Sequence, residues 1–126
     1  MIQQLATTIY NVSDLSRTKQ WLAQIFEITP YFDEPFYVGY NVGGFELGLL
    51  LDESNDNPSR HHPVLSYWRV DNLEASLELY QGRGAKIGEP LQDVGGGVKV
   101  ASILDPDGNH VGLIENPAFT IAGVGQ

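Results

Sequence analysis

Three ionisable side chains are the first candidates for chemistry, because each lies in a segment whose residues favour a β-strand. Glu46 lies within FELGLLL, Arg69 lies near the end of VLSYWRV, and His110 opens HVGLIE. A carboxylate can act as a general base or hold a cation, a guanidinium can clamp an anion, and an imidazole can move a proton or ligate a metal. Two interpretations of the first two residues are open: Glu46 pairs with Arg69, or each meets a ligand group of opposite charge.

The first half of the chain alternates strand and helix signals around Glu46. β-Branched and aromatic residues fill LATTIYNV, and either Ser13 or Asp14 can cap the helix that follows, whose apolar residues recur at helical spacing. Pro35 bends the next extended segment early, and Gly43 begins the Gly-Gly turn into the strand that carries Glu46. The predicted elements are a strand over Leu5–Val12, a helix over Leu15–Phe26, extended chain over Tyr31–Val42 and a strand over Phe45–Leu51.

The second half repeats this order after a polar run, DESNDNPSRHHP. A strand is predicted over Val64–Val70, a helix from Leu73 to the stop signals Gly82 and Gly84, and a strand over Val98–Leu104. A shift of 58 positions places Tyr10 on Trp68 and Asp14 on Asn72. The chain is therefore interpreted as two β-α-β-β-β copies, each too small to bury its own sheet face alone. Within one domain, 1–126, the first module spans about 1–52, the connector 53–63, the second module about 64–116 and the tail 117–126.

The stretch SILDPDGNHVGLIE predicts a hairpin that closes the second copy. Pro106 presets φ for the turn, Gly108 supplies the positive φ, and Asp105 can bond nearby backbone. On the returning strand, His110 and the two residues that alternate with it, Gly112 and Ile114, share one face, so one face should meet a core and the other something else. Glu115 has the opposite parity to His110 and is expected to be a surface carboxylate.

Composition narrows the classes of partner. The chain has 126 residues with 42% hydrophobic content, which is ordinary for a single domain with one core. It has no cysteine, which excludes disulfides and a thiolate nucleophile, and its amino-terminal segment shows neither a leader pattern nor a membrane span, so a cytoplasmic protein is expected. A net charge of −9 with seven scattered Lys plus Arg residues argues against nucleic acid and anionic membranes as partners.

YNVSDL and WRVDNL each introduce a helix, and DPDGNHVGLIE closes the second copy. In this the chain resembles the vicinal-oxygen-chelate superfamily, which includes glyoxalase I, bleomycin-resistance proteins, extradiol dioxygenases and fosfomycin-resistance enzymes. The resemblance covers nearly the whole chain, from about Leu5 to Asn116. It implies an α+β fold of two tandem βαβββ modules whose curled mixed sheet surrounds a cavity, with a homodimer partner often completing the wall. It implies a place for chemistry and leaves the chemistry open.

The enzymes of that superfamily hold one divalent metal through four strand positions. By offset from the motifs, the resemblance places these positions on Thr7, Glu46, Leu65 and Gly112. Only Glu46 is a useful ligand, whereas a catalytic metal requires three or more His or carboxylate ligands. Metal-dependent isomerisation and ring cleavage are therefore disfavoured, and neither a metal nor another cofactor is expected.

Residues of the same parity as these positions are predicted to line the cavity. His110 is one of them, and it either forms a displaced site with Glu46 or is a polar residue satisfied near its turn. The set is largely apolar with a few polar groups, as in small-molecule pockets. The predicted ligand-binding residues are Thr7, Ile9, Asn11, Glu46, Gly48, Leu65, Tyr67, Arg69, His110 and Gly112.

Other side chains have competing interpretations. His61 and His62 lie in the polar connector, where a histidine pair is more often solvated than metal-bound. Tyr10 and Trp68 carry the helix-facing parity and are predicted to pack in the core. Four aromatic residues near Pro30 and Pro35 either form a lid over the cavity or pack at an edge or dimer contact, namely Phe32, Phe36, Tyr37 and Tyr40.

Two functions from different classes follow. The first is a member of the glyoxalase/bleomycin-resistance group that binds or sequesters a small amphipathic molecule without a catalytic metal, with a cationic ligand favoured by the acidic surface. The alternative is a lyase, isomerase or dioxygenase of the same superfamily, with a site rebuilt around Glu46 and His110. Because most metal-ligand positions are lost, the sequence favours the first and leaves open whether the chain is an enzyme.

Overall fold

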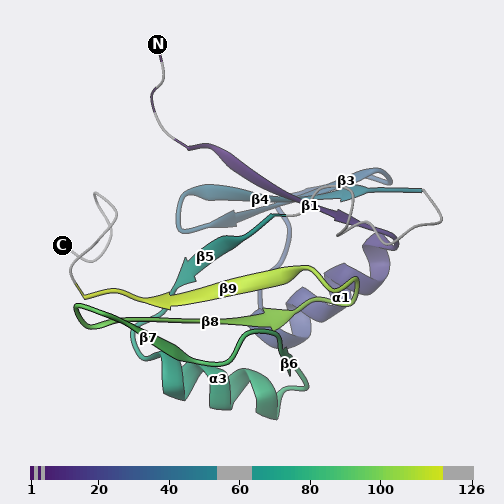
Figure 1. Cartoon of the computed structure of the whole chain (residues 1–126). Coiled ribbons are helices and arrows are strands. Elements are labelled where there is room, and N and C mark those ends of the chain that lie inside the picture. Colours follow the sequence, from purple (N-terminus) through teal and green to yellow (C-terminus); the bar gives the residue numbers. More distant parts are fainter. Residues whose placement is uncertain (2, 4, 54–63, 118–126) are drawn as a thin grey trace. The chain divides into compact units, whose positions relative to one another are not determined.

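The computed structural model describes residues 1, 3, 5–53 and 64–117, which fall into two compact units, one within 1–64 and one within 65–126 (Figure 1). Each unit has the order strand, helix and then further strands that form an antiparallel ladder. The two-copy α+β prediction is therefore confirmed. Across the described ranges, no helix is both long and apolar enough to cross a membrane.

The first unit is a four-stranded mixed sheet with one helix. The strand order is β1-β4-β3-β2, with β1 parallel to β4 and the other pairs antiparallel. β2 is a two-residue strand, and the bend predicted around Pro35 separates it from β3. The elements are β1 (Thr7–Val12), α1 (Leu15–Phe26), β2 (Phe32–Asp33), β3 (Tyr37–Val42) and β4 (Phe45–Leu51).

Helix α1 begins and ends where its cap residues require. The Asp14 side chain accepts a hydrogen bond from the Arg17 amide at 3.0 Å, which satisfies a donor that the first turn leaves unpaired. The helix ends at Glu27, which has a left-handed φ of 57° and donates its amide to the Ala23 carbonyl. Leu22 and Ile25 are buried and face the core of this unit, and full burial of such a side chain stabilises a fold by roughly 1.5–3 kcal/mol.

The turn between β3 and β4 fixes which side chains share a face. Gly43 and Gly44 both have positive φ, and the Gly44 amide donates to the Asn41 side chain at 2.9 Å. The register that follows pairs Asn41 with Glu46 and Gly39 with Gly48. Alternating residues on the other face of the sheet are buried in the core, namely Tyr10, Val12, Val38, Tyr40, Leu47 and Leu49.

The second unit is a five-stranded mixed sheet with one helix in its described part. The order is β5-β9-β8-β6, β7 also pairs with β8, and β5 runs parallel to β9. The sequence did not predict β6 and β7, which are short and largely exposed and so lack apolar alternation. The elements are β5 (Ser66–Arg69), α3 (Leu73–Gly82), β6 (Lys86–Ile87), β7 (Gln92–Gly95), β8 (Val98–Leu104) and β9 (His110–Glu115).

Helix α3 is capped from two directions. The Asn72 side chain accepts from the Ala75 amide at 3.0 Å, as its equivalence with Asp14 predicts. Oε1 of Glu115, on β9, accepts from the Leu73 amide at 2.8 Å. The prediction that Glu115 is only a surface carboxylate was therefore wrong. Its parity turns it toward the helix, whose N-terminal amides attract a negative charge.

The DPDGN turn forms as its residues predict. Gly108 has a φ of 83°, and Oδ1 of Asp105 accepts from the amides of Asp107 at 2.9 Å and Asn109 at 2.8 Å. Oδ2 of Asp105 accepts from the Asn109 side chain at 2.9 Å. Burial raises the pKa of the Asp105 carboxyl, and its hydrogen bonds from Asn109 oppose that rise. This turn sets where β9, and with it His110, begins.

Candidate ligand-binding site

Glu46 lies at the centre of a ring of hydroxyl groups in the first unit. Oε1 of Glu46 accepts hydrogen bonds from the Thr7 hydroxyl at 3.0 Å and the Tyr37 hydroxyl at 2.7 Å, and Oε2 accepts from the Tyr31 hydroxyl. We call Thr7, Tyr31, Tyr37 and Glu46 the hydroxyl ring. An ionised carboxylate is a pure acceptor, so each of these hydroxyls must donate to it.

The hydroxyl ring shifts the proton equilibria of its members. Hydrogen bonds from Tyr31 and then Tyr37, with a smaller one from Thr7, lower the pKa of Glu46, and partial desolvation opposes them. The bond to Glu46 raises the pKa of Tyr31, while desolvation followed by the bond to Glu46 raises that of Tyr37. At neutral pH the site therefore holds one carboxylate and two protonated phenols.

Two glycines of the sheet make room for the tyrosine rings. A Cβ on Gly48 would lie 2.7 Å from Cζ of Tyr37, so that ring lies across the Gly48 backbone. A Cβ on Gly39 would lie 3.0 Å from Oε2 of Glu46 and 3.2 Å from Cε1 of Tyr31. The Tyr31 amide also donates to the Gly39 carbonyl at 3.0 Å, which fixes this part of the chain beside β3.

The structure places the predicted residues of the first unit on one face of the sheet. The β1–β4 register pairs Thr7 with Glu46 and Ile9 with Gly48, and it pairs Asn11 with Leu50. Ile9 and Leu50 are each 38% exposed, whereas Asn11 is buried, so apolar side chains are accessible on this face. That these residues bind a ligand stays a prediction.

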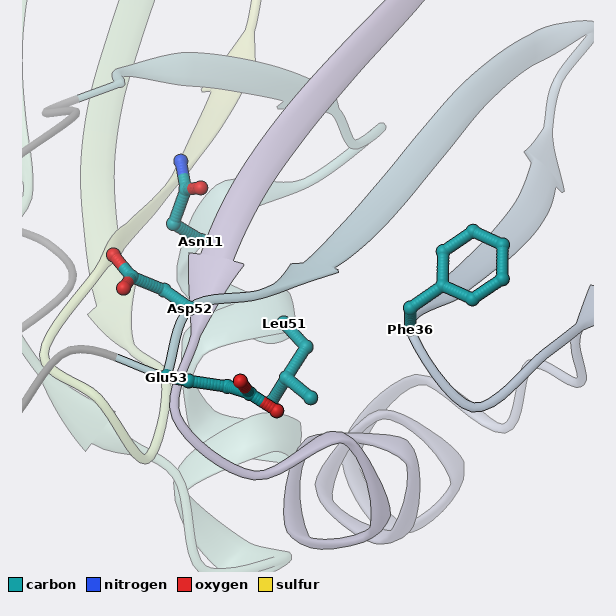
Figure 2. Close-up of a pocket in the computed structure, with 5 residues that line it drawn as sticks. All are labelled: Asn11, Phe36, Leu51, Asp52 and Glu53. Atoms are coloured by element: carbon teal, nitrogen blue, oxygen red, sulfur yellow. The ribbon is translucent and has the colours of Figure 1, made fainter.

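A hollow lies where β1 and β4 end. Figure 2 shows the Asn11 amide and the Asp52 carboxylate at the end of β1, with Phe36 apart on the loop between β2 and β3. The hollow has a volume of about 430 Å³ and is lined by Asn11, Phe36, Leu51, Asp52 and Glu53. Its two acidic residues, Asp52 and Glu53, directly follow β4, the strand that carries Glu46.

In the second unit, the predicted site residue His110 has a side-chain partner. Its Nδ1 lies 2.8 Å from Oγ of Ser102, and that Oγ also accepts from the Glu89 amide at 2.8 Å. Ser102 is buried, and its hydroxyl donates to Nδ1 where the ring proton of His110 lies on Nε2, or accepts from Nδ1 where the proton lies there. A Cβ on Gly88 would lie 2.8 Å from Nδ1, so the pair requires a glycine there.

The other predicted residues of the second unit differ in exposure. Leu65 and Tyr67 are 58% and 47% exposed, and Gly112 is buried. A Cβ on Gly112 would lie 2.7 Å from Cδ1 of Tyr67 and 2.6 Å from the Ser66 carbonyl oxygen. Arg69 ends β5 in the second unit, and its pairing with Glu46 stays a prediction. The three hydroxyl groups that donate to Glu46 all belong to the first unit.

The strand registers show that Glu46 and Gly112 are not equivalent positions. Ile9 pairs with Gly48, and Tyr67, which is 58 positions after Ile9, pairs with Gly112. Gly48 is therefore the counterpart of Gly112. Glu46, two positions earlier, is the counterpart of His110. Both glycines lie under a tyrosine ring, so a side chain that could ligate a metal cannot replace either without moving that ring or the backbone.

The donor set does not fit the divalent metal that the resemblance implies. Of the four positions, Thr7 and Glu46 bond each other, while Leu65 and Gly112 offer no ligand atom on their side chains. In the part of the chain that the structure describes, no three His, Asp or Glu side chains group together in a way that could hold a metal ion. His61 and His62 lie outside the described residues.

Sequence reasoning missed Tyr31, Ser102 and Gly88, and it considered Tyr37 only as part of a lid or of an edge or dimer contact. A usable signal for Tyr37 was the Gly-Gly turn, because counting back from it places Tyr37 on the same face as Gly48 and Glu46. No comparable signal marked Tyr31, because it lies outside the regular strands.

The other aromatic residues have different environments. Tyr10 and Tyr40 are buried in the core of the first unit, and burial followed by the charge of Asp33 raises the pKa of Tyr40 to about 12. Phe32 and Phe36 are 41% and 61% exposed. Core packing is confirmed for Tyr10, and the four aromatic residues predicted to form either a lid or an edge or dimer contact divide between core, site and surface.

Comparison with known proteins identifies the class. The family model of the Glyoxalase/Bleomycin resistance protein/Dioxygenase superfamily matches residues 4–113. The chain belongs to this superfamily. A search of curated proteins gave no match.

Solved structures share the fold at low sequence identity. A glyoxalase-related enzyme from Fulvimarina pelagi is 20% identical with a TM-score of 0.75, covering 99% of this chain and 96% of its own. A bleomycin resistance determinant encoded on transposon Tn5 is 19% identical with a TM-score of 0.74, covering 91% and 99%. Lactoylglutathione lyase from Agrobacterium tumefaciens is 17% identical with a TM-score of 0.76, covering 95% and 100%. Resistance proteins and lyases thus share this fold, which by itself does not select between binding and catalysis.

Proposed function

We propose that the chain binds a small amphipathic molecule, without a catalytic metal, on the sheet face that carries the hydroxyl ring. The single observation that carries this proposal is the set of three hydroxyl hydrogen bonds that Glu46 accepts. Thr7, Tyr31 and Tyr37 direct hydroxyl hydrogens at Glu46 and hold it in place, and the other three positions that the resemblance assigns to metal ligands supply no carboxylate or imidazole.

The neighbouring residues support a binding role. Ile9 and Leu50 are each 38% exposed on this face, and polar groups lie at both of its ends. Apolar contact area supplies affinity in such sites, and a few fixed polar groups supply orientation. Binding is therefore the function that the first unit supports best.

The competing proposal is an enzyme built around Glu46 and His110. One observation favours it: the two residues occupy equivalent register positions, and His110 is held by Ser102. Against it, the hydrogen bonds that lower the pKa of Glu46 make this carboxylate a weaker base. Binding without turnover therefore stands as the lead.

The test uses protein purified without chelator. Elemental analysis should find far less than one transition metal ion per chain, and the neutral fluorescent amphiphile N-phenyl-1-naphthylamine should bind saturably. Leu50→Asp should weaken this probe about tenfold or more, because it places a charge on the proposed apolar surface. Leu79→Asp is the matched control, since Leu79 is 50% exposed on α3.

Two results would contradict the proposal. One is a stoichiometric metal whose removal abolishes probe binding. The other is equal probe affinity in both aspartate variants, which would locate binding elsewhere.

Assembly as a homodimer is a separate proposal. Phe32, in the short strand β2, and Phe36, on the loop after it, are large, exposed side chains, and such residues are enriched in protein interfaces. Sedimentation velocity should give a dimer for the wild type and a monomer for the Phe32→Ser/Phe36→Ser double variant. A monomeric wild type would refute this assembly and leave the binding proposal in place.

A further inference from the structure

The hydroxyl ring has used all of its hydrogen-bond donors. Thr7, Tyr31 and Tyr37 each own one hydroxyl hydrogen, and each directs it at a Glu46 oxygen. The lowered pKa of Glu46 keeps the carboxylate ionised at neutral pH, so it has no proton to give either. A ligand that meets these four side chains finds no donor on them.

The hydroxyl ring still offers hydrogen-bond acceptors and a negative charge to a ligand. Each hydroxyl oxygen keeps unshared electron pairs, and Oε2 of Glu46 takes one donor where Oε1 takes two. Within the described part of the first unit, Glu46 makes no ion pair, and Lys19 of that unit is bound to Asp33 at 3.1 Å. The hydroxyl ring therefore carries a negative charge that no described cation of its own unit neutralises.

Aromatic groups adjoin this charge. Tyr31 is 63% exposed, and the Phe32 ring lies 6.1 Å from the Tyr37 ring at an interplanar angle of 59°. Faces of such rings attract cations, and their edges and bodies offer apolar contact. The negative charge of Glu46 and the neighbouring aromatic rings together favour a ligand in which a cation is attached to an apolar group.

We infer that the hydroxyl ring binds a protonated organic amine or amidine, a cation that brings its own N–H donors, as the polar end of the amphipathic ligand. This rests on the proposed function and narrows it. An anion or a carbonyl finds no donor on the ring and is repelled or unsatisfied, whereas an N–H cation forms charge-assisted hydrogen bonds to the remaining acceptors. A quaternary ammonium keeps the charge but cannot donate.

The experiment compares four compounds that share a benzyl group. Benzylammonium, benzyltrimethylammonium, benzyl alcohol and benzoate are each titrated into the full chain at neutral pH, with backbone amide NMR shifts and displacement of N-phenyl-1-naphthylamine as readouts. Benzylammonium should bind about tenfold or more tightly than benzyltrimethylammonium, benzyl alcohol should be weaker still, and benzoate weakest. The largest amide shifts should fall on Glu46 and its neighbours.

Two variants locate the effect. Glu46→Gln should weaken benzylammonium about tenfold and leave the neutral fluorescent probe within about twofold. Glu78→Gln is the matched control, because it removes the same charge from an exposed position on α3 and should change neither affinity.

Each alternative outcome has one meaning. Equal binding of benzylammonium and benzyltrimethylammonium, or tighter binding of benzoate, would overturn the inference while probe binding keeps the proposed function. If Glu78→Gln also loses the preference for benzylammonium, the inference is overturned, because general surface charge would then explain the binding. Absence of binding by the probe and by all four compounds would refute the proposed function itself.

Discussion

Tyr37 lies across Gly48 in the first unit, where a Cβ on Gly48 would come within 2.7 Å of the tyrosine Cζ. Tyr67 has the same relation to Gly112 in the second unit, but there a Cβ would also meet the Ser66 carbonyl oxygen at 2.6 Å. The two glycines occupy equivalent register positions, so their environments can be compared directly. The neighbour of Gly48 is the Tyr37 side chain, which can move. The neighbours of Gly112 include the Ser66 backbone, which cannot.

Substitution of the two glycines by alanine should therefore lower the free energy of unfolding by unequal amounts. Gly48→Ala should lower the free energy of unfolding by about 1–3 kcal/mol, because Tyr37 must swing away and lose its bond to Glu46. Gly112→Ala should cost more, because the obstacle is backbone. Urea unfolding of both variants measures this. Gly82→Ala, with open space around its Cβ at the end of α3, should be neutral or stabilising. Equal costs at Gly48 and Gly82 would contradict the close approach of Tyr37.

Removal of the Tyr31 hydroxyl should raise the pKa of Glu46 toward its ordinary value of 4.5, because the bond from Tyr31 is the largest cause of the lowering. Tyr37→Phe should raise it less and Thr7→Val least. Carbon-13 NMR titration of the Glu46 carboxyl measures the order. A Tyr31→Phe variant that titrates like the wild type would contradict this assignment.

The same shift predicts the pH dependence of stability. A carboxyl whose folded pKa is lowered stabilises the fold above its unfolded value of 4.5, and this contribution is lost as the pH falls through the lowered folded value. The free energy of unfolding should therefore fall more steeply on acidification below about pH 4.5 in the wild type than in Tyr31→Phe. Denaturant unfolding across this range is the measurement, and parallel curves would count against the prediction.

Two tyrosines on β3 should respond oppositely to loss of their hydroxyls. Tyr40 has a buried hydroxyl with no hydrogen-bond partner among the described residues, so Tyr40→Phe should leave the free energy of unfolding unchanged or raise it. Tyr37→Phe removes a bond to a charged acceptor and should lower stability by about 1 kcal/mol or more. Thermal and urea unfolding test both, and a clear loss in Tyr40→Phe would reveal an unseen partner.

Ser102 should determine the tautomer of His110. Oγ of Ser102 accepts from the Glu89 amide, and we expect its own hydrogen to be directed at Nδ1, so that neutral His110 should carry its proton on Nε2. Nitrogen-15 NMR of the ring at mildly alkaline pH should show this tautomer in the wild type and a mixture in Ser102→Ala. Ser16→Ala, on the exposed side of α1, is the control. A wild-type ring protonated at Nδ1 would refute the arrangement.

The sequence predicted the elements of the fold where hydrophobic period and turn chemistry agree. The bounds of α1, β4 and β8 are as predicted, because Asp14, the Gly-Gly turn and the DPDG turn each have a specific backbone requirement. The short strands β6 and β7 escaped prediction because they are held by pairing with β8 rather than by their own pattern.

The candidate site was predictable only in part. Period-two alternation placed Thr7 and Glu46 on one face, and their pairing confirms that placement. The tyrosines of the hydroxyl ring could not be assigned in the same way, since Tyr31 reaches Glu46 from irregular chain. The function of Glu115 was missed because parity identifies a face but not the helix end that the side chain meets there.

All hydroxyl hydrogens of the hydroxyl ring are already bonded to Glu46, and this has a consequence for any chemically altered form of the proposed ligand. Acylation of an amine removes its positive charge and leaves an amide carbonyl, a group to which the ring can offer no hydrogen. An acylated ligand would therefore bind this protein weakly. Binding by the chain and acylation would compete for the same nitrogen atom of the ligand.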